Sequence, residues 1–202
     1  MKNYLCINGK KTELTEEQMR QLGILKEPIA VLPDGGKIAK IGEYEFIVLE
    51  QDAGRVALLL KNTLCDMKFD SKCNNFAESN IREYLDEFAD KLADLVGEDN
   101  IVEHTVDLTS DDGLKCYGSC DCRVSLLTDQ MYRDNVYTID KYKVDKWWWL
   151  ATAYSTSKHG DTACVKCVSP SGYVFNRNSI YFNYGVRPFC ILKSNIFVSC
   201  EE

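Results

Sequence analysis

Between Asn80 and Val96 the apolar residues recur every three or four positions, so that they fall on one face of a helix. Asn80 and Glu83 have the spacing of an N-terminal capping box, and Gly97 follows where helices commonly end. We therefore predict one long amphipathic helix, whose stripe must pack against another element. The stripe consists of Ile81, Tyr84, Leu85, Phe88, Leu92, Leu95 and Val96. We expect Ile81, Leu85, Phe88 and Leu92 to be buried against a mixed or antiparallel sheet.

Shorter apolar stretches have the composition and the turn signals of β-strands. A hairpin is predicted from residues 43–51 and 55–61, and a second one from residues 165–168 and 173–176 around Ser169-Pro-Ser-Gly172. Further strands are expected at residues 124–127, which lead into a helical turn, and at residues 147–151, 180–183 and 189–192. One helix beside many strands predicts an α+β fold.

The first 30 residues have the pattern of a separate small unit. Residues 4–7 and 11–14 flank Asn8-Gly9, a strong hairpin signal because both residues tolerate positive φ. Residues 15–18 then form a capping box before a short helix. The predicted organisation is an N-terminal hairpin and helix at 1–30, a linker at Pro28–Gly36, and a main domain at 31–202.

Charge and hydropathy exclude some classes of partner. The 202-residue chain carries a formal net charge of -7 and no basic cluster, whereas nucleic acids and anionic membranes are bound by basic faces. We expect no nucleic-acid partner and no membrane insertion. The start of the chain has no signal-peptide pattern, which indicates synthesis in the cytoplasm. The compartment of action stays open, including a virion, because phage and lysis-released proteins carry no signal either.

Ten cysteines raise the question of metal ligation. Cys116, Cys120 and Cys122 lie close together, and Cys164 and Cys167 form a C-x-x-C. Four thiolates could hold zinc, but residues 165–166 belong to a predicted strand, which would turn Cys164 and Cys167 to opposite faces. We predict free thiols, no metal and no cofactor.

Other polar residues give no catalytic pattern. His104 and His159 lie beside no nucleophile motif, and His159 is in a polar turn. Asp107, Asp111, Asp112 and Glu103 lack the spacing of a calcium loop and are interpreted as a solvated acidic loop.

Three consecutive tryptophans predict a core strand. Alternation along a strand buries Trp147 and Trp149 on one face, or Trp148 on the other. We assign Trp147 and Trp149 a structural role. A sugar-stacking platform is the alternative, and it requires exposed rings.

An ordered set of motifs resembles a known but uncharacterised family. The motifs are SNIREYL at 79–85, VSLLT at 124–128, WWLAT at 148–152, SPSGYV at 169–174 and GVRPFCIL at 185–192. They are similar to a domain common in gut bacteria and their phages, over residues 31–202, although Ala151-Thr152 and Phe189 depart from its pattern. The ending also resembles C-type-lectin-like folds, including formylglycine-generating enzymes and phage receptor-binding proteins.

This resemblance implies a C-type-lectin-like domain in which Arg187 is buried, hydrogen-bonded and structural. In some members a diversity-generating retroelement substitutes surface codons, with Asn, Ser and Tyr as frequent products. The residues in the corresponding stretch, our candidate ligand-binding set, are Asn176, Asn178, Ser179, Tyr181, Asn183 and Tyr184. Tyr and Asn are also frequent on contact surfaces that bind without chemistry.

The leading hypothesis is therefore a non-catalytic module that binds a protein or a glycan, encoded by a phage or prophage. Two alternatives stay open. One is an enzyme of the formylglycine-generating type, with Cys164, Cys167 and Cys190 as its metal and thiol residues. The other is a structural phage component. The sequence does not define the oligomeric state.

Overall fold

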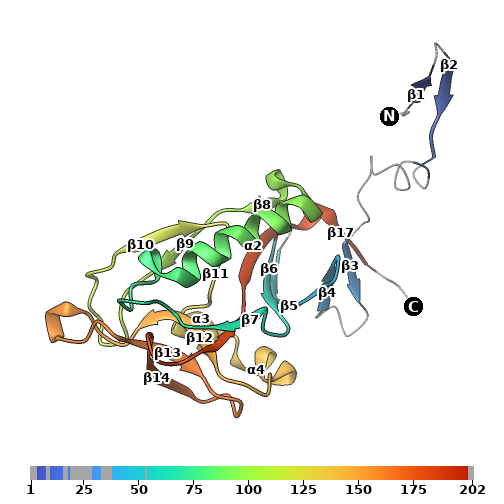
Figure 1. Cartoon of the computed structure of the whole chain (residues 1–202). Helices are drawn as coiled ribbons and strands as arrows, with labels where there is room; N and C mark the ends of the chain where they lie inside the picture. The colour runs from blue at the N-terminus through green and yellow to red at the C-terminus, as the bar shows by residue number, and fades with distance from the viewer. Residues whose placement is uncertain are drawn as a thin grey trace.

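The computed structural model describes residues 4–7, 10–15, 18, 29–32, 38–52 and 54–199 (Figure 1). The chain forms two larger β-sheets, two small ones and a few helices, so the α+β class is confirmed. None of the helices in these described ranges is long and apolar enough to cross a membrane.

The larger sheet has eight strands in the order β11-β16-β6-β5-β4-β3-β17, with β8 also paired to β16. Neighbours run antiparallel except β17 and β3. The strands are β3 (Ile29–Leu32), β4 (Ile38–Ile41), β5 (Tyr44–Gln51), β6 (Arg55–Leu60), β8 (Ile101–Val102), β11 (Val124–Ser125), β16 (Phe189–Lys193) and β17 (Phe197–Ser199). The first predicted hairpin is β5–β6. Part of the predicted linker is strand β3, because its apolar run pairs with β4; residues 33–37 lie outside the described ranges.

The second sheet has five strands in the order β14-β13-β12-β15-β7. They are β7 (Cys65–Met67), β12 (Trp148–Ala153), β13 (Cys164–Val168), β14 (Val174–Asn178) and β15 (Tyr184–Val186). The predicted hairpin around residues 169–172 is confirmed as β13–β14. The strand predicted at residues 180–183 is wrong: these residues form a turn and a loop before β15. Asn178 accepts a hydrogen bond from the backbone N–H of Ile180 over 2.9 Å, which closes that turn locally.

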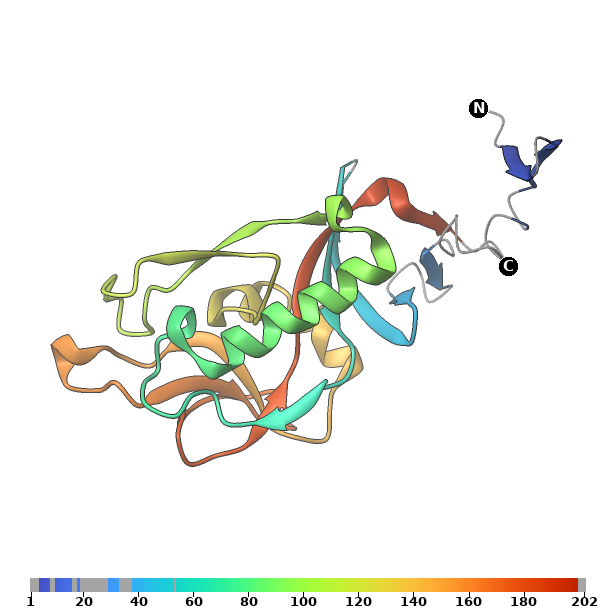
Figure 2. The same cartoon turned by 45° about the horizontal axis from the view of Figure 1, so that its top comes forward.

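Helix α2 (Asn80–Val96) lies against the eight-stranded sheet on the side of β11 and β6 (Figures 1 and 2). Ile81, Leu85, Phe88 and Leu92 are buried, as predicted. Ser79, rather than Asn80, is the N-cap residue, because its hydroxyl accepts a hydrogen bond from the N–H of Arg82 over 3.2 Å. Leu95, at the edge of the stripe, is 37% exposed.

The remaining elements are short. They are η1 (Phe76–Glu78), η2 (Glu98–Asn100), α3 (Asp129–Asp134), α4 (Val136–Ile139), η3 (Asp140–Tyr142), η4 (Ser157–His159), η5 (Ser194–Ile196), and the paired strands β9 (His104–Asp107) and β10 (Ser119–Cys122). Helix α3 is the helical turn expected after β11, and Thr128 caps it.

Near the N-terminus, β1 (Tyr4–Ile7) and β2 (Lys10–Glu13) pair as the predicted antiparallel hairpin. The capping box is present too. The N–H of Gln18 donates to Thr15 Oγ1 over 3.2 Å, and the N–H of Thr15 donates to Gln18 Oε1 over 3.0 Å. The helix predicted beyond Gln18 lies outside the described residues.

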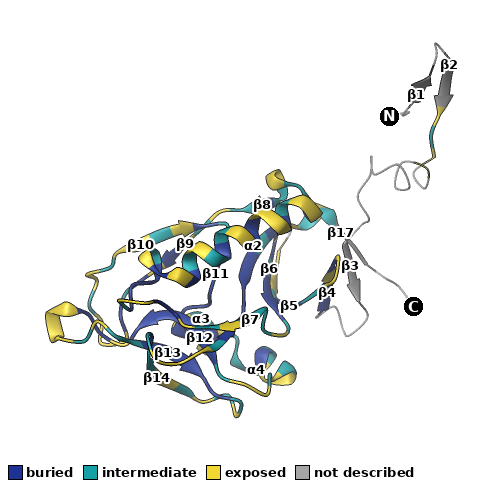
Figure 3. Cartoon of the chain, in the orientation of Figure 1, coloured by how far each residue is buried: buried dark blue, intermediate teal, exposed yellow. Residues whose placement is uncertain are grey.

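The core has two parts, one on each face of strands β5, β6 and β12. Phe46 and Trp149 belong to the part that includes α2, whereas Ile47 and Trp148 belong to the other part. Every residue of β12 is buried (Figure 3). Trp149 is therefore a core residue as predicted, but Trp148 is one as well, because both faces of the strand are covered. Trp147 precedes the strand and is only half-buried.

Candidate functional site

Arg187 lies in the core between β15 and β16, where the resemblance placed it, and is 1% exposed. Its Nε donates to the carbonyl of Leu60 over 2.7 Å, and its Nη2 donates to the carbonyls of Lys61 and Tyr142 over 2.8 and 3.2 Å. The guanidinium carbon lies 5.0 Å from the ring centroid of Trp148. Burial lowers the pKa of Arg187 to about 10. Backbone carbonyls and an aromatic face stabilise this charge, which is a structural arrangement.

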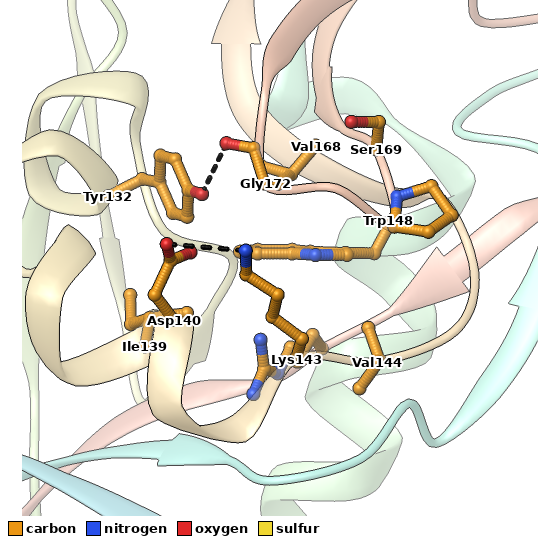
Figure 4. Close-up of a pocket in the computed structure, with 11 residues that line it drawn as sticks. Tyr132, Ile139, Asp140, Lys143, Val144, Trp148, Val168, Ser169 and Gly172 are labelled. Atoms are coloured by element: carbon orange, nitrogen blue, oxygen red, sulfur yellow. Dashed lines mark hydrogen bonds and ion pairs between the residues drawn. The ribbon is translucent and has the colours of Figure 1, made fainter.

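Arg187 and Trp148 line a cavity of about 10 Å³. Figure 4 shows the ring of Trp148 near Tyr132, whose hydroxyl donates to the carbonyl of Gly172 over 2.7 Å. Lys143 and Asp140 form an ion pair of 3.4 Å beside them. A volume of about 10 Å³ holds no more than about one water molecule. This cavity is too small for an organic ligand.

Aromatic side chains gather on the five-stranded sheet at β14, the start of β12 and β15. We call the set Trp147, Phe175, Arg177, Tyr181, Phe182 and Tyr184 the aromatic surface. Tyr184 stacks on Trp147 and on Phe182, each with ring centroids 5.5 Å apart and an interplanar angle of 20°. Phe175 lies 5.2 Å from Trp147. The rings thus form a continuous run from β14 to the loop before β15.

Much of the aromatic surface is open to solvent. Phe175 is 40% exposed, Phe182 42% and Tyr181 77%. The guanidinium of Arg177 lies 5.0 Å from the centroid of Trp147 and 5.3 Å from that of Phe175, so that a positive charge sits over the rings. Exposed apolar residues scattered singly are ordinary, but rings in contact with one another and with a cation form a patch that can bind.

The predicted ligand-binding residues divide into three groups. Asn176, Tyr181 and Asn183 are exposed, and Asn178 and Tyr184 are half-buried. Ser179 is fully buried and its hydroxyl donates to the carbonyl of Cys73 over 3.0 Å. The assignment of Ser179 to a ligand-binding surface is therefore wrong, because its side chain joins two loops inside the fold.

Sequence reasoning missed four members of the aromatic surface as ligand-binding residues. They are Phe175, Arg177 and Phe182, together with Trp147, which was assigned a structural role. The sequence contains a signal for two of these residues. Phe175 and Arg177 are two residues apart on strand β14, and alternation places such residues on one face. Phe182 follows the strand in a loop, for which no periodicity exists.

A second concave region is a polar cleft of about 280 Å³. It is lined by Asp107, Thr109, Ser110, Asp111, Thr128, Asp129, Gln130 and Thr152. Asp111 pairs with Lys166 over 3.0 Å and Asp129 with Arg133 over 2.8 Å. These two carboxylates are already neutralised by the protein's own cations.

The acidic loop beside this cleft is held by hydrogen bonds of Asp112. Asp112 accepts hydrogen bonds from the hydroxyls of Ser110 and Ser155 over 2.6 and 2.5 Å, and His159 Nδ1 lies 2.7 Å from its Oδ2. These contacts, the hydroxyl bonds first, lower the pKa of Asp112. Asp112 is exposed, as expected for a solvated acidic loop, and its hydrogen bonds also tie residues 110, 155 and 159 together.

The cysteines assigned to the enzyme alternative are largely enclosed. Cys167 and Cys190 are buried and Cys164 is half-buried. Burial raises the pKa of Cys167 and of Cys190 to about 12, so that both thiols stay protonated at neutral pH. Within the described part of the chain, no three His, Cys, Asp or Glu side chains gather as a metal site.

Residues 110–194 match a family model described as "Domain of unknown function (DUF6273)". The matched segment contains Arg187, the whole aromatic surface and strands β12 to β16, whereas α2 and strands β3 to β6 precede it. No curated protein gives a significant match. No solved structure gives one either.

Proposed function

We propose that this chain is a non-catalytic binding module whose aromatic surface contacts a partner protein. One observation carries the proposal: Phe175, Trp147, Tyr184 and Phe182 form a continuous run of rings that is partly exposed and carries Arg177. Trp, Tyr and Arg dominate the binding energy of protein interfaces. Rigid rings also lose little conformational entropy when they are covered.

A protein ligand fits this surface better than a glycan. A sugar stacks on the open face of an aromatic ring. The ring of Trp147 is instead in contact with Phe175, Tyr184 and Arg177. It is half-buried, and we infer that mainly its edge is accessible to a ligand. Edges, a guanidinium and the neighbouring amide of Asn183 suit the mixed apolar and hydrogen-bonding contacts of a protein interface.

The finer fold assignment belongs to the same proposal. The ordered motifs and the buried Arg187 near the C-terminus support a C-type-lectin-like domain, in which the aromatic surface would be the variable, ligand-facing side. A phage or prophage origin and codon diversification at Asn176, Tyr181 and Asn183 are parts of this hypothesis that the sequence resemblance motivates.

The test is selection of ligands from a random peptide display library with the full chain as bait, alongside a glycan array. We expect selected peptides to bind the parent protein and to lose at least about tenfold in affinity for a Phe175→Ala, Phe182→Ala double variant, since interface aromatics commonly contribute more than 1.4 kcal/mol. The matched control is Tyr137→Ala, which removes a ring that is 88% exposed on α4.

Three results would count against the proposal. Peptides that bind the double variant as well as the parent would place the interface elsewhere. Glycan binding that depends on Phe175 and Phe182 would replace the protein partner by a sugar. Equal losses for the double variant and for Tyr137→Ala would mean that the selected peptides recognise exposed rings without specificity.

A further inference from the structure

Two thiols lie together at the end of strand β10, far from the aromatic surface in the chain. The sulfur atoms of Cys120 and Cys122 are 3.6 Å apart. Cys122 is 1% exposed and packs in the core beside α2, whereas Cys120 is half-buried. Among the described residues this strand pairs with β9 alone, in a sheet of two strands. A change in β10 therefore disturbs neither of the two larger sheets directly.

Residues two apart on a strand point to the same face, which is why these two sulfurs meet. Two steps along a strand span about 6.6 Å between Cα atoms, just inside the upper limit of about 6.8 Å for a disulfide. The sulfurs need to approach by about 1.5 Å to reach a bond length of about 2.05 Å. The Cβ atoms of two such residues lie about as far apart as their Cα atoms, beyond the about 4.5 Å that a disulfide allows, so that a bridge requires a local bend of β10. The bridge is strained for that reason, and thiols can reduce it again.

We propose that Cys120 and Cys122 are a dithiol modification site that reacts with low-molecular-weight disulfides, such as oxidised glutathione. The thiolate of Cys120 attacks one sulfur of the disulfide, forms a mixed disulfide and releases one thiolate. The thiol of Cys122 then loses its proton and attacks the Cys120 sulfur, which releases the second thiolate and closes the Cys120–Cys122 bond. Two protein thiols are oxidised and one small disulfide is reduced to two thiols.

The surroundings assign the two roles. Cys120 is the thiol that solvent can reach, and the hydrogen bond from Cys122, followed by the positive charge of Arg82, lowers its pKa. The pKa of Cys122 is raised, first by the same hydrogen bond and then by burial. Arg82 is held in place on α2, where it pairs with Asp86 and donates from Nη2 to the carbonyl of Asp121 over 3.3 Å. Cys120 therefore attacks and Cys122 resolves.

The sequence makes the test simple. Trypsin cleaves after Lys115 and Arg123, so that Cys116, Cys120 and Cys122 are released on one peptide. The folded, reduced full chain is incubated with oxidised glutathione, unfolded, alkylated and digested. We expect the peptide to carry one alkyl group, on Cys116, in place of three, and to have lost two hydrogen atoms. Reduced glutathione should restore all three alkylation sites.

Variants separate the steps. In Cys122→Ser the reaction should stop at a glutathione adduct on Cys120, whereas Cys120→Ser should leave Cys122 alkylated and free of glutathione. Cys116→Ser should still form the bridge. Four results would overturn the proposal: no reaction in the parent, a stable adduct on Cys120 of the parent, a bridge that includes Cys116, or the same bridging rate in unfolded protein.

Discussion

Two arginine–tryptophan pairs in the described part of the chain have the same separation and opposite surroundings. The guanidinium of Arg187 lies 5.0 Å from Trp148 in the core, and that of Arg177 lies 5.0 Å from Trp147 at the surface. The two tryptophans are consecutive, so the pairs lie on opposite sides of the chain as it enters β12. Such contacts contribute about 0.5–1 kcal/mol when exposed and about 2 kcal/mol or more when desolvated. Identical chemistry is structural in one place and available for binding in the other.

The hydrogen bonds of the two arginines sharpen the contrast. Arg187 reaches carbonyls at Leu60, Lys61 and Tyr142, which connects β6, η3 and the segment between β15 and β16. Arg177 donates from Nη1 to the carbonyl of its own neighbour Asn176 over 3.0 Å. The three hydrogen bonds of Arg187 therefore join backbone segments that are distant in the sequence, whereas this bond of Arg177 stays within β14. We expect the fold to depend more on Arg187 than on Arg177.

Arg187→Ala is expected to produce the largest loss of stability. It leaves three backbone carbonyls without their donors and exposes the face of Trp148 to a void, so that the free energy of unfolding should fall by about 3–5 kcal/mol. Arg177→Ala should cost less than about 1 kcal/mol. Urea unfolding followed by circular dichroism measures both.

Arg187→Lys tests the reason for that difference. Lysine keeps the charge but lacks the planar fork that donates in three directions, so it should recover only part of the lost stability. Full recovery would show that charge alone matters at this position. Equal losses for Arg187→Ala and Arg177→Ala would remove the distinction between the two pairs.

Replacing the tryptophans should give the next effect. Trp148→Phe shrinks a side chain that is 2% exposed and weakens its contact with Arg187, which should cost about 1–3 kcal/mol. Trp147→Phe changes a half-buried ring that solvent can replace, and should cost less than about 1 kcal/mol. Thermal melts of the two variants measure both losses of stability. A larger loss for Trp147→Phe would mean that the aromatic surface is part of the core.

The sequence predicted elements whose signal is local. The stripe of α2 and the hairpins β5–β6 and β13–β14 depend on periodicity and turn residues, and they are confirmed. Residues 180–183 were misread because Tyr, Phe and Ile favour strands, whereas Asn178 closes a turn there by bonding to the N–H of Ile180. Local side-chain bonds of this kind override propensity.

The candidate site was harder to predict, because its residues come together only through contacts between segments that are distant in the sequence. Asn176, Tyr181 and Asn183 are exposed as expected, but Ser179 is buried because Cys73, 106 positions earlier, offers its carbonyl. Trp147 belongs to the surface because Tyr184 of β15 and Phe175 of β14 contact its ring. Neither contact can be predicted from the spacing of residues along the chain.

Alkaline pH should destabilise the fold through a buried cysteine of the core. Burial raises the pKa of Cys190, which is fully buried on β16, from about 9 to about 12. The unfolded chain therefore releases this proton first, and stability falls as pH rises from about 9 towards 12, by up to about 1.4 kcal/mol per pH unit. Cys190→Ala and Cys190→Ser remove the titration, so both should show a smaller loss between pH 8 and 10 than the parent. Urea titrations under reducing conditions measure these slopes, and slopes equal to that of the parent would contradict the assignment.

The smallest effect is expected for a triple variant of the exposed residues, Asn176→Ala, Tyr181→Ala and Asn183→Ala. All three side chains are exposed, so each change should alter stability by less than about 0.5 kcal/mol. Tyr184→Ala is the matched variant, because Tyr184 contacts Trp147, Trp149 and Phe182, and it should cost more than the three changes together. The same triple variant should lose affinity for peptides selected on the parent, because side chains that contribute little to stability can still contribute to binding. A triple variant that unfolds would show that these residues support the loop before β15. One that folds and keeps full affinity would confine the interface to the other rings of the aromatic surface and Arg177.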